Sequence, residues 1–373
     1  MHKVVISGTG LFTPPNAVSN EALVEAFNAW VRKANAANAE AIAAGSVEPL
    51  PESSAEFIVK ASGIRQRYLM DAAGVLDPER MVPHLGERPN EALSVQAEMA
   101  VAAARDALAR AGRAGSDVDL VICACSNLQR AYPAVAIEVQ QAIGAAGFAY
   151  DMNVACSSAT FGIQAAVSAI ATGAARTVLV VNPEICSAHL NFRDRDSHFI
   201  FGDAATAVLL ERADAATAEG RLEVLGCKLA TVFSNNIRNN AGFLNRCDEA
   251  GIGAPDKLFV QQGRKVFKEV CPMVGEHIVG HLGELGIAAE GVRRFWLHQA
   301  NLAMNQLIAR RVLGREATEN EAPVILDRYA NTSSAGSVIA LHLHRDDLAS
   351  GEIGVLSSFG AGYSVGSVVL RRI

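Results

Sequence analysis

The segment DMNVACSSATFG (151–162) carries a thiol at the point where an apolar run ends and a run of small residues begins. We expect a strand up to Val154 and a helix after the serines, which places Cys156 at a strand-to-helix junction. Backbone N–H groups and the positive end of a helix dipole favour the thiolate, the nucleophilic form of cysteine. The alternative is that Cys156 is a small buried apolar residue, as we expect of the other cysteines.

A similar pattern recurs near the C-terminus. The residues CSSA that begin at Cys156 match TSSA at 332–335, and the apolar run at 118–126 matches the run at 293–301. Several matching elements in the same order indicate a duplicated α/β unit. Two such halves would bring their equivalent junctions together at a shared interface.

Two polar residues stand at these repeated positions. His298 lies near the end of the run at 293–301, and Asn331 stands one residue before the match to Cys156. We therefore expect these three side chains to face one cavity. Imidazole and carboxamide groups can both donate hydrogen bonds to one carbonyl oxygen, so the pair could stabilise an enolate. A lone histidine is more often a packed residue, and it is the repeat that favours the catalytic interpretation.

Apolar periodicity predicts the elements that position these residues. Strands alternate with helices in both halves, which favours mostly parallel sheets covered by helices. We predict one long or two short helices over 19–45, a helix over 90–112, and a strand, junction and helix over 324–351. The other predicted strands lie at 3–10, 118–126, 148–154, 177–185, 201–212, 293–301, 352–360 and 361–372.

Composition argues against several classes of function. The chain has 373 residues, a net charge of -6 and a pI near 5.9, so it lacks the positive field of a general nucleic-acid or membrane binder. Its seven cysteines form no C-x-x-C pair, so neither a disulfide framework nor a metal site is predicted. No signal-like segment and no run of 18 apolar residues occurs, which indicates a soluble, cytoplasmic protein. The glycine-spaced turn at 357–366 precedes a strand and not a helix, which argues against a nucleotide cofactor.

Six motifs, read in order, are similar to those of a known family. They resemble the thiolase-fold condensing enzymes, and most of all β-ketoacyl-acyl-carrier-protein synthase III. The motifs are SGIRQRY (62–68), VACSSA (154–159), FGDAATA (201–207), HQAN (298–301), YANTSSAG (329–336) and FGAGYSVG (359–366). The resemblance implies a homodimer with an α/β, thiolase-like five-layer αβαβα fold made of two duplicated halves. It places the nucleophilic cysteine in an N-terminal half (1–215) and the histidine and asparagine in a C-terminal half (216–373).

The family's functional residues map onto positions of this chain. The resemblance implies a catalytic triad of Cys156, His298 and Asn331, and an oxyanion hole formed by the backbone N–H groups of Cys156 and Ala361. The implied substrate-binding residues are Phe57, Tyr132, Arg195 and Phe201. The implied docking residues for the acidic carrier protein are Arg264, Lys265, Lys268, Arg310 and Arg311. The resemblance implies no cofactor and no metal.

The implied reaction is the condensation that initiates fatty-acid synthesis. Cys156 would take an acyl group from acyl-CoA, and the acyl-enzyme would condense with malonyl-acyl-carrier protein to give a β-ketoacyl-carrier protein, CoA and CO₂. Extra residues near 26–50 and 70–90, together with Tyr132, resemble the subgroup primed by medium-chain acyl-CoA such as octanoyl-CoA, the β-ketodecanoyl synthases.

Several related functions remain open from the sequence. Asn331 argues against elongating synthases, which resemble this fold but carry a second histidine there, and against thiolases, which carry a second cysteine. A type III polyketide synthase-like enzyme, a head-to-head acyl-CoA condensing enzyme and a hydroxymethylglutaryl-CoA synthase share much of the site, although the last needs a catalytic glutamate that the sequence does not place. A non-catalytic acyl-CoA-binding protein is the alternative from another class.

Overall fold

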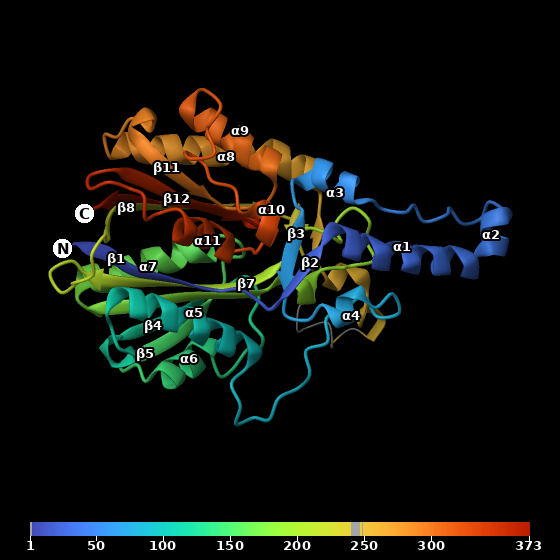
Figure 1. The fold of residues 1–373 in the computed structure, drawn as a ribbon, viewed down its shortest axis with the longest axis horizontal. Coiled ribbons are helices and arrows are strands. Elements are labelled where there is room, and N and C mark those ends of the chain that lie inside the picture. Colours follow the sequence, from blue (N-terminus) through green and yellow to red (C-terminus); the bar gives the residue numbers. More distant parts are fainter. Residues whose placement is uncertain (1, 240–246, 248) are drawn as a thin grey trace.

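The helices and strands stack in five layers (Figure 1). The computed structural model describes residues 2–239, 247 and 249–373. From one face to the other, the layers are α8 and α9, the C-terminal strands, α7 and α11, the N-terminal strands, and α5 and α6. The helices are α5 (Val95–Ala111), α6 (Val135–Ile143), α7 (Ser158–Thr172), α8 (Gly263–Glu284), α9 (Leu302–Leu313) and α11 (Ala335–Leu343). The predicted αβαβα arrangement is confirmed.

The strands of the two halves follow the same spatial order. The N-terminal strands are β1 (Val4–Phe12), β4 (Leu120–Ala124), β5 (Phe148–Met152), β6 (Thr177–Ile185) and β7 (Asp203–Arg212). The C-terminal strands are β8 (Leu222–Ser234), β11 (Val292–Leu297), β12 (Ile353–Gly360) and β13 (Gly362–Arg372). They lie in the order β1-β7-β6-β4-β5 in one half and β8-β13-β12-β11 in the other. The pairs with helical crossovers are parallel: β4 with β5 and with β6 in one half, and β11 with β12 in the other. The next pair in each half, β6 with β7 and β12 with β13, is antiparallel.

A short antiparallel contact joins the two sets of strands. β1 and β8 pair through Val5 with Glu223 and Ile6 with Leu222. The boundary predicted at 215/216 falls in the turn between β7 and β8. Since Cys156 belongs to one set and His298 to the other, the catalytic pocket has to form where the two sets face each other.

The strand predicted from Val324 onward is wrong. The chain there forms the short helix α10 (Leu326–Tyr329), and no strand among the described residues of the C-terminal half corresponds to β5. The physical reason is a buried side chain: Oε1 of Gln299 accepts the backbone N–H groups of Ile325 and Leu326 at 3.0 and 3.2 Å. These N–H groups begin a helical turn and cannot pair with a neighbouring strand.

Helix α7 lies at the centre of the fold, between the two sets of strands. The segment 155–172 has the length and hydropathy of a membrane span. However, two of its residues, Ile163 and Ile170, are fully buried in the apolar core. Gly162 allows close packing, because a Cβ there would lie 2.9 Å from side-chain atoms of Ala124 and Val180. The apolar character of α7 is therefore that of a core helix.

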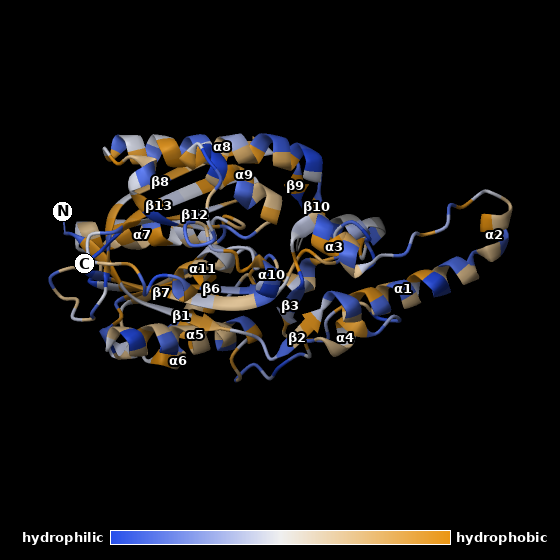
Figure 2. Cartoon of the chain, turned by 45° about the horizontal axis from the view of Figure 1, so that its top comes forward, coloured by the Kyte–Doolittle hydropathy of each residue, from blue (hydrophilic) through white to orange (hydrophobic). Residues whose placement is uncertain are grey.

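The remaining elements surround one end of the layers and include a projecting arm. They are β2 (Asn16–Ser19), α1 (Asn20–Ala37), α2 (Ala39–Ala43), α3 (Ala55–Ser62), β3 (Gln66–Leu69), α4 (Ala73–Leu76), β9 (Ile237–Arg238) and β10 (Val260–Gln261). Figures 1 and 2 show α1 running outward, with α2 at its outer end and an extended segment returning to α3. The helical region predicted over 19–45 is confirmed as α1 and α2. Neither 26–50 nor 70–90 contributes a residue to the pockets around Cys156.

Candidate active site

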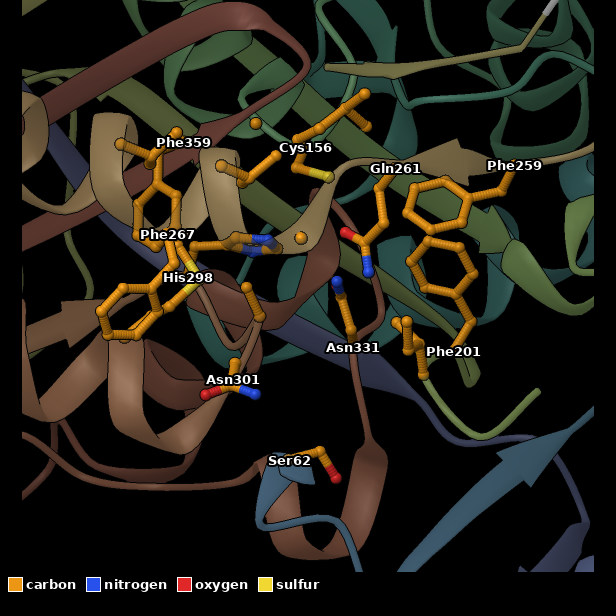
Figure 3. Close-up of a pocket in the computed structure, with 18 of the residues that line it drawn as sticks. Ser62, Cys156, Phe201, Phe259, Gln261, Phe267, His298, Asn301, Asn331 and Phe359 are labelled. Carbon is orange, nitrogen blue, oxygen red and sulfur yellow. The ribbon is translucent and has the colours of Figure 1, made fainter. Parts of the chain in front are cut away.

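Cys156, His298 and Asn331 line one pocket of about 290 Å³. Each comes from the end of a different element: Cys156 precedes α7, His298 follows β11, and Asn331 follows α10. In Figure 3 the Cys156 sulfur points toward the space between the His298 ring and the Asn331 side chain. The convergence predicted from the repeated junctions is therefore present in the structure.

Ser333 connects these groups and was missed by the sequence analysis. Its backbone N–H donates to Oδ1 of Asn331 at 2.8 Å, and its hydroxyl donates to the Cys156 sulfur at 3.3 Å. Because Oδ1 is occupied, the Nδ2 group of Asn331 remains to donate into the pocket. Ser333 has a φ of +50°, a strained conformation that puts its N–H and hydroxyl on their two partners. The signal that could have found it is its place in TSSA (332–335), the match to CSSA at 156–159.

The expectation that the helix start stabilises the Cys156 thiolate is wrong for the ligand-free protein. Burial raises the pKa of the Cys156 thiol to about 11, the Ser333 hydroxyl lowers it in part, and the Glu184 carboxylate raises it further. The first helical residue of α7 is Ser158, two positions beyond the cysteine. Loss of hydration therefore outweighs the hydrogen bonds that favour the thiolate, and the thiol is the favoured form.

This pKa predicts how alkylation of Cys156 depends on pH. Below the pKa the thiolate fraction rises tenfold for each pH unit, so the rate with iodoacetamide should rise steadily from pH 7 to pH 10 without a plateau. Peptide mass spectrometry measures the rate, with the exposed Cys247 as an internal reference. Ser333→Ala removes a hydrogen bond that lowers the pKa, so it should slow alkylation further at each of these pH values. A plateau below pH 9 would contradict the prediction.

His298 is held as a neutral imidazole. Its side chain is almost wholly buried, and this burial lowers its pKa to about 4, with a smaller opposing effect from the Ser333 backbone. The ring packs edge-on against Phe359, with centroids 5.0 Å apart. Its Nδ1 has no hydrogen-bond partner among the described residues. A neutral imidazole can still donate a hydrogen bond to a developing oxyanion. Because it carries no positive charge, it does not form an ion pair with a substrate carboxylate.

Glu184, which the sequence analysis also missed, links the two halves by hydrogen bonds beside the pocket. Its carboxylate accepts the backbone N–H of Ser126 at 2.9 Å and of Ser334 at 3.2 Å, and it accepts both of their hydroxyls. Burial raises the pKa of Glu184 to about 7, while these hydrogen bonds act in the opposite direction. Since Ser334 follows Ser333, the carboxylate fixes the residue that contacts both Cys156 and Asn331.

Hydroxyl pairs also join the two halves between α7 and the C-terminal strands. The Thr160 and Ser358 hydroxyl oxygens lie 2.7 Å apart, and Ser364 donates to Ser157 at 2.9 Å. All four residues are buried. We call these contacts, together with those of Glu184, the hydroxyl seam.

The predicted oxyanion-hole residues lie together. Ala361, between β12 and β13, lines a second pocket of about 130 Å³ that also includes Cys156. The preceding Gly360 permits this approach, since a Cβ at that position would lie 2.7 Å from Cβ of Cys156. Phe201 and Phe259 line both pockets, and their rings meet edge-to-face with centroids 4.8 Å apart.

The predicted substrate-binding residues fall at three different places. Phe201 lines the pockets and forms a β-bridge with Asn331. Phe57 and Arg195 lie outside these pockets, where the guanidinium of Arg195 stacks on the Phe57 ring at 4.1 Å from its centroid. Tyr132 is 84% exposed and lines neither pocket of its own chain.

The predicted docking residues form two groups at different distances from the pocket. Arg264, Lys265 and Lys268 are exposed in the first turns of α8, where Gly263 and Phe267 line the pocket. Figure 2 shows this end of α8 as hydrophilic. The second group lies in the last turn of α9. There Arg310 forms an ion pair with Glu316 at 3.0 Å, and the Arg311 stem lies close to Gly275 of α8.

Metal ligation finds no support in the part of the chain that the structure describes. No group of three or more histidine, cysteine or acidic side chains there could hold a metal ion. The described residues that line the catalytic pocket also include no lysine or arginine. The polar side chains that line this pocket are the Cys156 thiol, the His298 imidazole, three carboxamides, the Ser62 hydroxyl and the Asp196 carboxylate.

The amino-acid sequence of this chain is similar to those of known proteins. Two models of the 3-oxoacyl-[acyl-carrier-protein] synthase III family match it, one over residues 150–231 and a C-terminal one over residues 282–372. A β-ketodecanoyl-[acyl-carrier-protein] synthase of Pseudomonas aeruginosa is 67% identical over 349 residues, which cover 94% of this chain and 100% of that protein. The chain belongs to the synthase III family.

More distant members of the synthase III family agree with this assignment. A β-ketoacyl-[acyl-carrier-protein] synthase III of Mesorhizobium japonicum is 32% identical over 327 residues, covering 87% of this chain and 93% of that protein. The crystal structure of a 3-oxoacyl-(acyl carrier protein) synthase III from Pseudomonas aeruginosa has a TM-score of 0.76 at 25% identity, covering 99% of this chain and 98% of that one. As a synthase III, the protein is a condensing acyltransferase, and the family predicted from the motifs is confirmed.

Proposed function

We propose that this synthase III condenses a medium-chain acyl-CoA with malonyl-acyl-carrier protein and releases CoA and CO₂. The observation that carries the proposal is the convergence of Cys156, His298 and Asn331 on one pocket in a chain 67% identical to a β-ketodecanoyl synthase. A β-ketodecanoyl product has ten carbons, of which malonyl contributes two, so the primer has eight. The protein groups suffice for this chemistry, and we propose that no cofactor takes part.

In the first half-reaction the Cys156 sulfur attacks the thioester carbonyl carbon of the acyl-CoA. The thiol proton leaves as the carbon–sulfur bond to the enzyme forms, and the bond to CoA breaks, so that CoA departs as a thiol. The N–H groups of Cys156 and Ala361 act as the oxyanion hole that holds the carbonyl oxygen as it becomes negative. The neighbouring pocket that Cys156 shares with Ala361 has room for the start of the acyl chain.

In the second half-reaction the carbon–carbon bond to the malonyl carboxylate breaks and CO₂ leaves. The electron pair forms an enolate, whose oxygen accepts hydrogen bonds from His298 and from Nδ2 of Asn331. The enolate carbon then attacks the acyl-enzyme, and Cys156 departs as a thiolate that regains its proton. The larger of the two pockets has no lysine or arginine among its described lining residues, so a malonyl carboxylate held there has no cation beside it, and this favours the neutral CO₂.

A panel of acyl-CoA primers with two to twelve carbons, each assayed with malonyl-carrier protein, tests this function. We expect the highest kcat/KM with octanoyl-CoA, a β-ketodecanoyl-carrier protein as product, and an acyl adduct on Cys156. A CoA-bound polyketide as product would indicate a type III polyketide synthase-like enzyme instead, and a head-to-head ketone would indicate a head-to-head acyl-CoA condensing enzyme. An absent adduct, or one on a different cysteine, would favour the non-catalytic acyl-CoA-binding protein.

We also propose that the carrier protein docks on the basic start of α8. Arg264, Lys265 and Lys268 are exposed next to residues that line the pocket, and an acidic partner is attracted to such a patch. Arg310 and Arg311 lie at the far end of α9, and Arg310 is already neutralised by Glu316. We therefore assign them a smaller share of the docking.

Charge reversal separates these two groups. Changing all three α8 residues to glutamate should raise KM for malonyl-carrier protein by about tenfold or more at low salt, while Arg310→Glu with Arg311→Glu should raise it less. Neither set should change the rate of Cys156 acylation by octanoyl-CoA. High salt should reduce the difference between wild type and variants. Equal losses in both half-reactions would count against a docking role.

We further propose that the protein is a cytoplasmic homodimer joined through β5. This strand lies at the edge of the nine-stranded sheet, and its Phe148 and Tyr150 are 48% and 37% exposed. Tyr132, which we expect to enter the partner's acyl pocket, and Ile137 are also exposed. An open strand edge with large apolar side chains is a typical site of association. Sedimentation should show twice the chain mass, and Phe148→Lys with Tyr150→Lys should yield monomers.

A further inference from the structure

The wall of the catalytic pocket carries a carboxamide that the mechanism above does not use. Gln261 lies on β10, paired with Ile237 of β9, and both residues line the pocket. In Figure 3 the Gln261 side chain points into the cavity and faces Asn331. Phe259 and Phe201 beside it are aromatic, so a polar group in this part of the wall stands out.

The hydrogen-bonding groups of two other polar side chains that line the pocket, Asn301 and Ser62, are already engaged. Asn301 donates to the carbonyl of Ala61 at 2.8 Å and accepts the N–H of Ala303 at 2.9 Å. The Ser62 hydroxyl donates to one neighbouring backbone group at 2.7 Å and accepts from another at 3.1 Å. In contrast, the Gln261 side chain makes no hydrogen bond with any described residue. Its donor and acceptor are both available to a substrate.

We propose that Gln261 binds the amide nearest the thioester sulfur in the phosphopantetheine arm of both substrates. The inference rests on the proposed function, because acyl-CoA and malonyl-carrier protein share this arm. An amide that leaves water for an apolar channel needs a partner for its N–H and one for its C=O, and a carboxamide offers either. Two methylene groups separate this amide from the sulfur, and Gln261 faces the cavity that holds Cys156 and Asn331. Gln261 is thus a specificity-determining residue for amide-bearing thioesters.

Two small thioesters isolate this contact from the rest of CoA. The octanoyl thioester of N-acetylcysteamine retains the amide in question, whereas the octanoyl thioester of 2-ethoxyethanethiol has similar length and no amide. The second-order rate of Cys156 acylation is measured by intact-protein mass spectrometry in wild type and Gln261→Met, a variant of similar size without hydrogen-bonding groups. Gln262→Met is the matched control, since Gln262 is the next residue and does not line the pocket.

We expect Gln261→Met to slow acylation by the amide-bearing thioester and by octanoyl-CoA about three- to tenfold, the usual net worth of one hydrogen bond. The amide-free thioester should react equally with Gln261→Met and wild type, and Gln262→Met should react as wild type with all three. An equal loss with and without the amide, or no loss at all, would overturn the proposal. Because the readout is acylation, a wild-type protein that acylates but does not condense would contradict the proposed function without obscuring this result.

Discussion

Cys156→Ser is expected to abolish the acyl adduct and to lower condensation by at least about 10³-fold, because a serine hydroxyl without an adjacent activating base is a far weaker nucleophile than a thiolate. Loss of the nucleophile should leave the enolate-stabilising groups in place. The variant should therefore still decarboxylate malonyl-carrier protein. Intact-protein mass spectrometry after mixing with octanoyl-CoA measures the adduct, and CO₂ release measures the decarboxylation.

Cys186→Ser provides the matched control for this experiment. Cys186 is buried and lines the pocket that Cys156 shares with Ala361, so it is the neighbouring thiol that could be acylated instead. Burial raises its pKa well above the usual value, as it does for Cys156, but Ser333 donates a hydrogen bond to the sulfur of Cys156. We expect this variant to keep the adduct. An adduct that is present in Cys156→Ser and absent in Cys186→Ser would show that Cys186, and not Cys156, is the acylated residue.

The second large effect is expected at the two enolate-stabilising residues. His298→Ala and Asn331→Asp should each lower decarboxylation of malonyl-carrier protein by about 10²–10³, the usual effect of removing one donor to an oxyanion. Asn331→Asp keeps an acceptor for the N–H of Ser333, which holds the side chain in position, but it replaces the Nδ2 donor by a negatively charged oxygen. Both variants should still form the acyl adduct on Cys156.

The half-reactions are measured separately to test this division of labour. Adduct formation is followed by mass spectrometry, and decarboxylation by release of CO₂ from malonyl-carrier protein. The pKa of His298 near 4 adds a second check, because a ring that stays neutral should give wild-type decarboxylation no histidine-dependent change between pH 6 and pH 9. Variants that lose both half-reactions equally would indicate a collapsed pocket and contradict the assigned roles.

The sequence predicted that Cys156, His298 and Asn331 share a pocket because they stand in or beside repeated motifs. Cys156 and Asn331 stand at or next to matching sequence motifs of two similar halves, and His298 follows a strand that recurs in both. Alternation of apolar runs also located most strands and helices, since burial on both faces imposes long apolar segments. The strand from Val324 failed because one distant side chain, Gln299, supplies hydrogen bonds that start a helix there.

The residues that support the site could not be predicted in the same way. Gln261 lies in a two-residue strand, too short to show a periodic pattern, and its place in the pocket depends on pairing with a distant segment. Glu184 belongs to a buried strand, where a carboxylate is unexpected until its four donors are seen. The state of Cys156 was misjudged because a sequence shows the start of a helix but not the depth of burial.

The hydroxyl seam constrains how this protein can change over evolution. Hydrogen bonds such as those of Thr160 with Ser358 and of Glu184 with Ser334 are directional, so they tolerate little sliding of one half against the other. An apolar interface could accommodate a small shift of one half against the other. Here the same shift would move Cys156 away from His298 and Asn331. N- and C-terminal halves exchanged between distant relatives would therefore assemble with matching strands and still be inactive, unless the residues along the boundary were transferred together.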